Sequence, residues 1–485
     1  MRCSLFHFVL AAALSSLALW PRPARSGIEE TFGLSSRGIA LGGAYTSLVC
    51  DTSAAYYNPA GLNGFPHWRR GGADGEGLEA AGFSLDLGTL YGASALSRRI
   101  DGVQKDGGAP TAAGGVYGLS LDLERLLGVP YTALGMIAYM PYDVLFEYES
   151  QSITNPIWIR HFDGYNHLSL YPAIAFSPSK YISVGIGLRF SLQIETHTNA
   201  RYWYEDDCQQ PPEESWRCAH VDMGEEVTTG SHFSYLVGIM ARPIENLKLA
   251  AVFREGSDVY DWGDTRITNI PLFLFEISYE YDHLLSHYYH PTQYEFGASW
   301  EDDFWMAALT ASYNEWDDFI DAYRELAVPT LQNTVTLRAG GGIRVHPSTT
   351  LLLGYAYEPS PVPAQTMISN FLDCDRHILS LGSSVWVDEL FGFASPRIGL
   401  NLHFQLQILP ERSHTKDAEA IREFYRERLA SVEVLDEDGN AVGSLDPQTQ
   451  AKLVERYTDK ALLRGERFSY SGLFYSFGLT LNLVF

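Results

Sequence analysis

The chain has 485 residues, a formal net charge of −25, and 46% hydrophobic and 13% aromatic residues. So acidic a chain is a poor candidate for binding phosphate backbones, and we expect no nucleic acid among its partners. Beyond the N-terminus there is no continuous apolar stretch of about 18 residues, which argues against a membrane-spanning helix. The length and the 43 glycines are compatible with a large all-β protein.

Residues 1–26 have the form of a secretory signal peptide. A short apolar run, residues 5–20, is followed by Ala24 and Ser26, small residues at the two positions that a signal peptidase reads. The run is too short to span a membrane. Cys3 would be removed with the signal, and no Leu-x-x-Cys pattern for lipid attachment lies near the cut. We therefore expect an exported protein whose N-terminus is not acylated.

Residues 27–76 do not alternate between polar and apolar residues, and they are rich in glycine. Their apolar residues, such as Leu41, favour a packed plug, because a disordered tail would lack them. Asn58-Pro59 predicts a turn, since proline locks φ and asparagine hydrogen-bonds to its local backbone. We therefore divide the mature chain into an N-terminal plug, residues 27–76, and a barrel, residues 77–485.

The last segment of the chain, Phe468 to Phe485, has the sequence FSYSGLFYSFGLTLNLVF. One face is apolar and the other is mostly small and polar, and this period of two predicts a long strand. The two faces suit lipid on one side and a wet lumen on the other, with a half-buried strand of a large soluble sandwich as the alternative. The terminal phenylalanine resembles the C-terminal assembly signal of bacterial outer-membrane barrels. We therefore expect the barrel-assembly machinery among the partners.

Similar alternation recurs along the chain and predicts a 14-stranded antiparallel transmembrane β-barrel, in the all-β class. The strands are expected to start near residues 80, 114, 131, 166, 181, 231, 246, 291, 304, 333, 349, 375, 396 and 468. Residues 272–282 could form a further strand. An odd number would place the two ends of the chain on opposite sides of the membrane, so we assign residues 272–282 to an outer loop.

Short and long connections alternate along the predicted barrel. The long ones are residues 199–230, 260–290, 359–374 and 410–467. Bacterial barrels have short periplasmic turns and long outer loops, so this alternation predicts that both termini are periplasmic. In the longest connection, Ala418–Ser431 and Pro447–Leu463 are candidate helices. We favour a solvated cap there over a dedicated partner-binding helix.

Two cysteines, Cys208 and Cys218, lie in one polar segment that contains proline and acidic residues. In an oxidising compartment this spacing predicts a disulfide within the loop. A metal site that includes His220 is the alternative. The remaining pair, Cys50 and Cys374, cannot be assigned a partner from the sequence. We expect no metal and no other cofactor.

Specific motifs resemble the FadL/TodX family of outer-membrane transporters. Residues 37–45 (RGIALGGAY) and 51–62 (DTSAAYYNPAGL) are similar to the N-terminal hatch of that family, and Asn58-Pro59-Ala60 matches its hatch motif. Residues 351–363 (LLLGYAYEPSPVP) and 373–382 (DCDRHILSLG) resemble late strands of the family barrel. The resemblance covers nearly the whole mature chain, with the long connection at 410–467 and the cysteine-containing loop as departures.

The resemblance implies passive uptake of hydrophobic compounds, such as long-chain fatty acids or aromatic hydrocarbons, across the bacterial outer membrane. Substrate would enter from outside, occupy an apolar pocket above the hatch, and leave sideways through the wall into the membrane lipids. Such a route bypasses the polar lipopolysaccharide layer, and an apolar solute gains free energy by burying its surface. A barrel of this size can function alone, so we expect a monomer.

For a fatty acid, a cation in the lumen should bind the carboxylate, and arginine can do so with two parallel hydrogen bonds. By strand parity Arg189, Arg338 and Arg344 are expected to point inward, and so are Arg254 and Arg376. The alternative is that these arginines pair with acidic residues in the lumen and stiffen the barrel.

Gly135 and Pro141, in the segment YTALGMIAYMPYD, are candidates for a kink that opens the wall. Both residue types weaken a strand ladder, although they also mark ordinary bulges.

An enzyme within the barrel would need a nucleophile and a base in reach of each other. The sequence has no G-x-S-x-G elbow and no H-E-x-x-H motif, so we expect no catalytic residues and no enzyme activity. The sequence is also compatible with two functions besides selective uptake. A general diffusion pore would lack a plug, and a surface adhesin would use the acidic outer loops.

Overall fold

The computed structural model describes residues 28–63, 82–106, 111–142, 146–147, 157–160, 166–204, 219–272, 275–320, 326–387, 397–435, 441–463 and 465–485. Fourteen antiparallel strands form a closed barrel, in which each strand pairs with the next along the barrel wall. The last strand, β23 (Arg467–Val484), pairs with the first, β1 (Phe83–Ile100), from Ile100↔Phe468 to Ser84↔Val484. Closure pairs the backbone N–H and C=O groups of both edge strands, so the barrel wall has no free edge.

The other strands of the barrel are β3 (Thr111–Asp122), β4 (Thr132–Pro141), β8 (Ser169–Ser179), β9 (Ile182–Tyr204), β10 (Ala219–Ile244), β11 (Leu247–Arg254), β14 (Thr292–Glu301), β15 (Trp305–Glu315), β16 (Thr334–His346), β17 (Thr349–Glu358), β19 (Arg376–Val387) and β20 (Arg397–Thr415). The predicted strand number is confirmed. Thirteen strands begin within three residues of the expected position, and β10 begins at Ala219 instead of near residue 231.

The outer surface of the barrel is an apolar band. On β17, Leu351, Leu353 and Tyr355 are 51, 69 and 42% exposed, whereas Leu352 and Ala356 face inward and are buried. The same alternation occurs on β16 and β19. Aliphatic and aromatic side chains over a closed wall match the surface that a hydrocarbon environment requires. No helix in the described part of the chain is both long and apolar enough to cross a membrane.

Two regions expected to be loops are largely strands. Within 199–230, the described residues 199–204 and 219–230 are the continuing ends of β9 and β10, which pair from Tyr204↔Ala219 down to the barrel. Within 260–290, β12 (Ser257–Leu272) and β13 (Phe275–His290) form a hairpin, and β12 pairs in parallel with β9. Residues 272–282 therefore belong mainly to a strand, but one outside the fourteen of the barrel. The strand alternative that the sequence offered for residues 272–282 is therefore the one that the structure shows.

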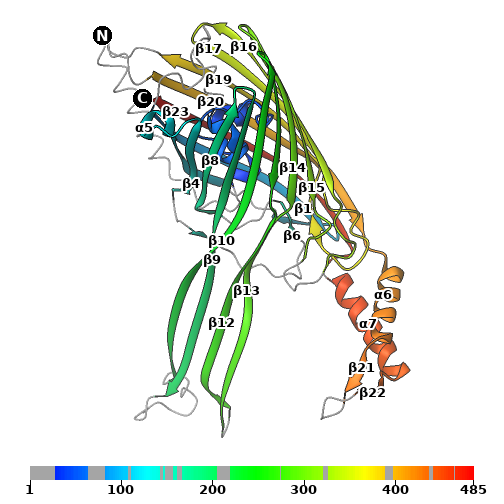
Figure 1. The fold of residues 1–485 in the computed structure, drawn as a ribbon. Helices are drawn as coiled ribbons and strands as arrows, with labels where there is room; N and C mark the ends of the chain where they lie inside the picture. Colours follow the sequence, from blue (N-terminus) through cyan, green and yellow to red (C-terminus); the bar gives the residue numbers. More distant parts are fainter. Residues whose placement is uncertain are drawn as a thin grey trace.

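Both long hairpins project from one end of the barrel, and the C-terminus lies at the other end (Figure 1). The helices α6 (Ala418–Ala430) and α7 (Pro447–Leu463) lie at the end that carries the long hairpins, and both were expected from the sequence. Asp417 caps α6 by accepting hydrogen bonds from the N–H groups of Glu419 and Ala420. Thr366 lies near the base of this helical pair, where its carbonyl accepts from the Asp417 N–H at 2.8 Å.

Shorter elements complete the described chain. They are β2 (Val103–Asp106), α5 (Leu123–Leu127), β5 (Phe146–Glu147), β6 (Ile157–Trp158), β7 (Asn166–His167), β18 (Phe371–Leu372), β21 (Glu433–Leu435) and β22 (Ala441–Ser444). Of these, β6 and β18 form a parallel pair, in which Ile157 lies opposite Phe371 and Trp158 opposite Leu372. This pair matters for the site because it carries residues 157–160 against residues 371–374.

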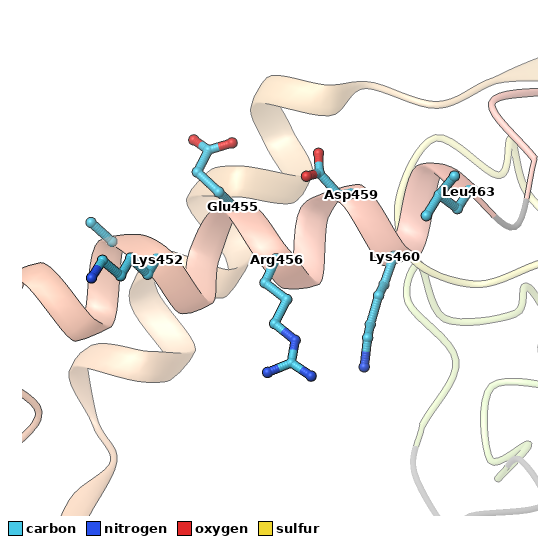
Figure 2. A pocket seen from close by; sticks show the side chains of 7 residues that line it. Lys452, Glu455, Arg456, Asp459, Lys460 and Leu463 are labelled. Atoms are coloured by element: carbon cyan, nitrogen blue, oxygen red, sulfur yellow. The ribbon is translucent and has the colours of Figure 1, made fainter.

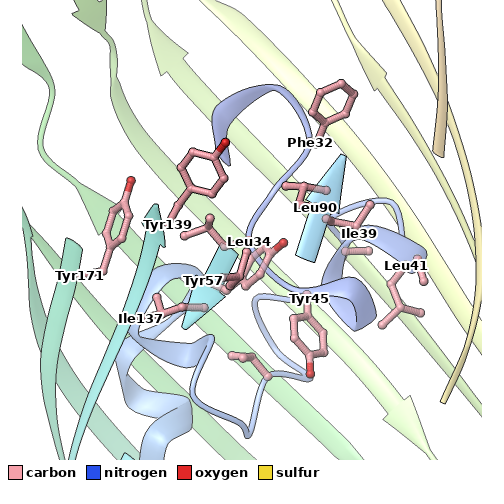
Figure 3. Close-up of a cluster of buried hydrophobic side chains, with 14 of the residues drawn as sticks. Phe32, Leu34, Ile39, Leu41, Tyr45, Tyr57, Leu90, Ile137, Tyr139 and Tyr171 are labelled. Carbon is pink, nitrogen blue, oxygen red and sulfur yellow. The ribbon is translucent and has the colours of Figure 1, made fainter. Parts of the chain in front are cut away.

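Residues 28–63 lie inside the barrel, as the blue ribbon in Figure 1 shows. They fold as α2 (Ile28–Thr31), α3 (Ser36–Ala40), α4 (Ala54–Tyr57) and the 3₁₀ helix η1 (Pro59–Asn63). Their apolar side chains form one buried cluster with the inner wall, in which Leu34, Ile39 and Tyr45 are at most 1% exposed (Figure 3). Helices this short are not stable alone, so packing against the wall holds them in place.

Candidate functional site

The motif Asn58-Pro59-Ala60 joins α4 to η1 and holds the turn between them. The Asn58 side chain donates from Nδ2 to the Thr46 carbonyl at 3.0 Å and accepts from the Ala60 N–H at 3.1 Å. Proline at the first position of η1 has no N–H that would be left without a partner. On the barrel wall, the Ser183 hydroxyl donates to the Ala60 carbonyl at 2.7 Å.

This motif lies against the wall at two glycines on the adjacent strands β9 and β10. A Cβ atom on Gly185 of β9 would lie 2.5 Å from the Pro59 carbonyl carbon. A Cβ atom on Gly238 of β10 would lie 2.0 Å from the Asn58 amide oxygen. Gly185 and Gly238 are also direct partners in the β9–β10 ladder. The pair therefore forms a flat patch on which the motif lies.

Further contacts anchor the N-terminal segment to other parts of the wall. Thr46 donates to Glu295 of β14 at 2.9 Å, and Thr480 of β23 donates to the Ser36 hydroxyl at 2.9 Å. On β20, the Gln407 amide donates to the Thr31 carbonyl at 2.6 Å. Contacts with β9, β14, β20 and β23 therefore hold the segment to four strands of the wall.

A cavity of about 180 Å³ lies between the N-terminal segment and the end that carries the long hairpins. Its lining includes five arginines (Arg160, Arg189, Arg254, Arg338, Arg376), four glutamates (Glu29, Glu30, Glu295, Glu358) and the aromatic residues Phe32, Tyr56, Tyr57, Tyr171, Tyr289 and Trp316. The cavity is thus charged as well as aromatic. The inward positions of several strands place guanidinium groups beside the aromatic side chains at this one height.

One side of the cavity is organised around the Glu358 carboxylate. Arg338 binds its Oε1 at 2.9 Å, Arg376 binds its Oε2, and an Arg160 nitrogen lies 3.8 Å from Oε2. Arg338 also donates to the Ser312 hydroxyl at 2.7 Å. Glu358 is 7% exposed, so three cations share one buried anion. Removal of the Glu358 carboxylate would leave buried guanidinium groups uncompensated, which is strongly destabilising.

Arg160 reaches the cavity from outside the barrel ladder. The pairing of β6 with β18 continues in a hydrogen bond from the Ile159 N–H to the Leu372 carbonyl, at 3.1 Å. Arg160 then donates a hydrogen bond from Nε to Asp373 Oδ1 at 3.0 Å, and its Nη2 forms an ion pair with Oδ2 at 2.7 Å. Strand parity could not find Arg160, because residues 157–160 are not part of an alternating segment.

The other side of the cavity joins the wall to α2. Arg189 of β9 binds Glu30 at 3.1 Å, and His290 at the end of β13 also contacts the Glu30 carboxylate. Arg254 of β11 donates to the Tyr56 carbonyl at 3.0 Å, and its guanidinium lies 5.2 Å from the centre of the Tyr56 ring. Burial raises the pKa of Glu29, the neighbour of Glu30, to about 7.

Aromatic rings form the floor and the roof of the cavity. In the floor, the Tyr56 ring packs edge-to-face on Tyr171 at 5.1 Å and on Tyr57 at 4.9 Å, measured between centroids. In the roof, Tyr289 packs against Trp316 at 5.7 Å and against Phe319 at 5.2 Å. The three rings of the roof belong to, or pack against, a second buried hydrophobic cluster that also contains Ile159 and Val362.

Of the arginines expected to face the lumen, Arg189, Arg254, Arg338 and Arg376 all line the cavity. Arg344 does not. It lies close to the short β16–β17 turn, where its N–H donates to the Phe304 carbonyl at 2.8 Å. Parity assigns a face of the strand but no height along it, so it could not separate Arg344 from the others.

The expected kink at Gly135 is not present. Pairing of β4 is continuous with β3 from Ala133 to Pro141 and with β8 from Thr132 to Tyr139. Gly135 instead makes room for the N-terminal segment, because a Cβ atom there would lie 2.3 Å from Leu62 Cδ2. Pro141 still pairs with Gly114 of β3.

An irregularity does occur one strand further on, between β8 and β9. Their pairing lapses at Tyr171 and Pro172 and resumes in the same register at Ala173. Proline has no N–H to donate to the ladder. On the inner side of this gap, Tyr171 and Arg189 line the cavity.

The predicted disulfide partners Cys208 and Cys218 lie outside the described residues, as does the predicted signal peptide. Cys50 and Cys374 are free thiols. In the ranges that the structure describes, no group of His, Cys, Asp and Glu side chains could hold a metal ion.

A second hollow lies on the surface of α7. It is lined by Ala451, Lys452, Glu455, Arg456, Asp459, Lys460 and Leu463, all from this one helix (Figure 2). Leu463 is 84% exposed, and the Lys452, Arg456 and Asp459 side chains diverge rather than point at a common centre. We assign no chemistry to this surface.

No protein-family model and no curated protein matches the chain. Among solved structures, it resembles the P. putida toluene transporter TodX with a TM-score of 0.51 and 11% identity, over 93% of this chain and 98% of that one. Two TodX variants described as monoaromatic hydrocarbon channels are similar. The deltaS2S3 mutant has a TM-score of 0.50 at 12% identity, over 93% and 99% of the two chains. The deltaS2 mutant has a TM-score of 0.50 at 10% identity, over 94% and 99%. The chain therefore shares the fold of these barrels.

Proposed function

We propose that this protein is a bacterial outer-membrane channel of the FadL/TodX type, which takes up hydrophobic compounds by passive diffusion. The observation that carries the proposal is a cavity between an internal N-terminal segment and a cluster of aromatic side chains, within a barrel of apolar outer surface. A general pore has no use for an interior segment anchored on four strands. The named function of the similar barrels, toluene and monoaromatic hydrocarbon transport, agrees with this proposal.

The ligand would be a hydrophobic compound, with long-chain fatty acids and aromatic compounds as the two candidate classes. Guanidinium groups from four strands of the wall converge on the cavity and provide charge-assisted hydrogen bonds to a carboxylate. Tyr56, Tyr171 and Phe32 provide apolar surface for the remainder of the molecule. Residues 28–63 would act as the hatch, with Asn58-Pro59-Ala60 as its fixed point on the wall.

Release would occur sideways, through the wall between β8 and β9. The ladder gap at Tyr171 and Pro172 lies directly beside the cavity and faces lipid on its outer side, where Leu188 is 43% exposed. An apolar solute that leaves there enters the membrane without crossing water. We place the long hairpins and α6–α7 outside the cell and both termini in the periplasm, since the short turns lie at the end of the C-terminus.

Uptake of radiolabelled ligand by intact cells tests the proposal. The wild type is compared with a variant that carries Asn58→Ala and Pro59→Ala, at matched surface expression and with a long-chain fatty acid and toluene as probes. The barrel is checked by its heat-dependent mobility in gels. Altered uptake with an intact barrel supports a hatch-controlled channel. Uptake that equals that of cells without the protein, for both probes in the wild type, would refute hydrophobic transport.

A further inference from the structure

We propose that the cavity selects a carboxylate carried on a single aromatic ring, a compound of the benzoate class, over both neutral hydrocarbons and long-chain acids. This inference rests on the proposed uptake function and specifies its substrate. It follows from three independent properties of the cavity: its volume, the geometry of its rings, and the position of one arginine.

The volume fits one ring. A buried apolar cavity of about 150 Å³ is known to hold a benzene molecule, and this cavity measures about 180 Å³. The difference accommodates a small polar substituent. A long-chain fatty acid has about twice as many heavy atoms as benzoate and would extend beyond a volume of this size.

The aromatic rings in the floor of the cavity pack edge-to-face, and the ring of a bound ligand could make a further contact of the same kind. Tyr56 packs edge-to-face on Tyr57 and on Tyr171, with interplanar angles of 83° and 82°. Aromatic pairs prefer such T-shaped contacts over face-to-face stacks, and each contributes about 0.5 to 1.5 kcal/mol beyond area burial. A saturated chain gains the burial term but not this directional term.

Arg254 is the arginine that a ligand carboxylate can use. Arg338 and Arg376 bind Glu358, and Arg189 binds Glu30. Arg254 by contrast contacts the Tyr56 carbonyl and the Tyr56 ring, with no carboxylate within ion-pair distance among the residues that the structure describes.

The surroundings of Arg254 complete an anion site. Gln293, its direct partner on β14, also lines the cavity and offers an amide N–H₂. A carboxylate bound to Arg254 would place its ring beside Tyr56, because the guanidinium already lies over that ring.

A neutral ring fits the volume but leaves Arg254 without an anion. Sites built to bind a polar group of the substrate reject analogues that lack it by large factors, because the site's own polar group then loses that partner. The cavity therefore differs in selectivity from a site that holds a hydrocarbon alone.

Direct binding to the purified, detergent-solubilised full chain tests the inference, with benzoate, toluene and palmitate as probes. We expect benzoate to bind most tightly. Arg254→Gln should weaken benzoate binding by about tenfold or more, the loss of a charge-assisted hydrogen bond, and leave toluene unchanged. Arg254→Lys, which keeps the charge but not the paired donors, should lie between. Arg344→Gln, outside the cavity, is the matched control and should match the wild type.

Three results would overturn the inference. If toluene and benzoate bind with equal affinity, and Arg254→Gln leaves both affinities unchanged, the cavity does not discriminate ligands by charge. Tighter binding of palmitate than benzoate would refute the size argument while leaving the uptake function standing. Failure of all three probes to bind, together with failed uptake in cells, would refute the proposed function itself. Heat-dependent gel mobility of each variant confirms that the barrel is folded.

Discussion

Gly238 on β10 faces Asn58 of the internal segment so closely that a Cβ atom on the glycine would lie 2.0 Å from the asparagine amide oxygen. Asn58 cannot move aside at low cost, because its side chain is hydrogen-bonded at both ends, to the Thr46 carbonyl and the Ala60 N–H. Position 238 of the wall therefore has to be glycine for Asn58 to keep its place. This contact is the most sensitive point at which to test whether residues 28–63 act as a hatch.

We expect Gly238→Ala to displace the hatch, at a cost of about 1 to 3 kcal/mol for overpacking a buried contact. Single-channel recordings should then show a higher conductance or frequent openings. Gly224→Ala is the control in the same strand, since no atom lies within 4 Å of a Cβ placed there. Identical conductance of the two variants would mean that the segment does not block the lumen.

Glu358→Gln should destabilise the barrel by about 3 kcal/mol, since it removes the anion shared by Arg160, Arg338 and Arg376. The measurement is the urea or thermal midpoint of the folded form in detergent. Glu280→Gln is the control, because Glu280 pairs with Arg266 at 4.0 Å and is 65% exposed. Equal midpoints for both variants would show that the three-arginine cluster contributes nothing to stability.

Stability should fall as the pH rises toward neutrality, partly because of Glu29. Burial raises the pKa of Glu29 to about 7 in the folded protein, so between its unfolded-state pKa and pH 7 the folded form binds more protons. The stabilisation is therefore complete at low pH and lost as the pH rises through about 7. Glu29→Gln should flatten this dependence in hydrogen-exchange measurements on residues 28–63 between pH 5 and 8. Glu419→Gln, at a site 76% exposed, should keep the wild-type slope.

A disulfide across the ladder gap should block lateral release. Pro172→Cys and Leu188→Cys would occupy positions that continue the β8–β9 register, so oxidation can join the two strands. Uptake should fall on oxidation and recover on reduction. The control is Leu353→Cys with Leu381→Cys, a pair of outward residues in the continuous β17–β19 ladder. If oxidation leaves uptake unchanged in both pairs, the compound does not leave between β8 and β9.

Phe485→Ala should reduce assembly in cells more than stability in vitro. The Phe485 ring stacks on Phe83 at 4.5 Å with an interplanar angle of 8°, at the end where β23 closes on β1. One such contact contributes about 0.5 to 1.5 kcal/mol, little for a barrel of this size. A large loss of folded protein in cells with a near-normal melting temperature would indicate recognition by the assembly machinery. A parallel loss in both measurements would reduce Phe485 to a packing residue.

The sequence alone determined the barrel, because the face of each residue in a strand is a local property. Alternation with a period of two predicted all fourteen strands, and the apolar residues of the N-terminal segment predicted that it packs. It also assigned Arg338 and Arg376 correctly to the lumen. Residues 272–282 could be recognised as a possible strand, but the sequence could not show that β12 and β13 pair as a hairpin outside the barrel wall.

Only the tertiary structure decided which inward residues meet. Arg344 shares a face of β16 with Arg338, but six residues of strand separate them by about 20 Å, so only Arg338 reaches the cavity. Arg160 joins Glu358 through the pairing of β6 with β18, segments more than 200 residues apart. The height of a residue along the barrel depends on the stagger between strands, and contacts across the lumen depend on the segment packed inside. The alternation of residues within a single strand contains no information on either.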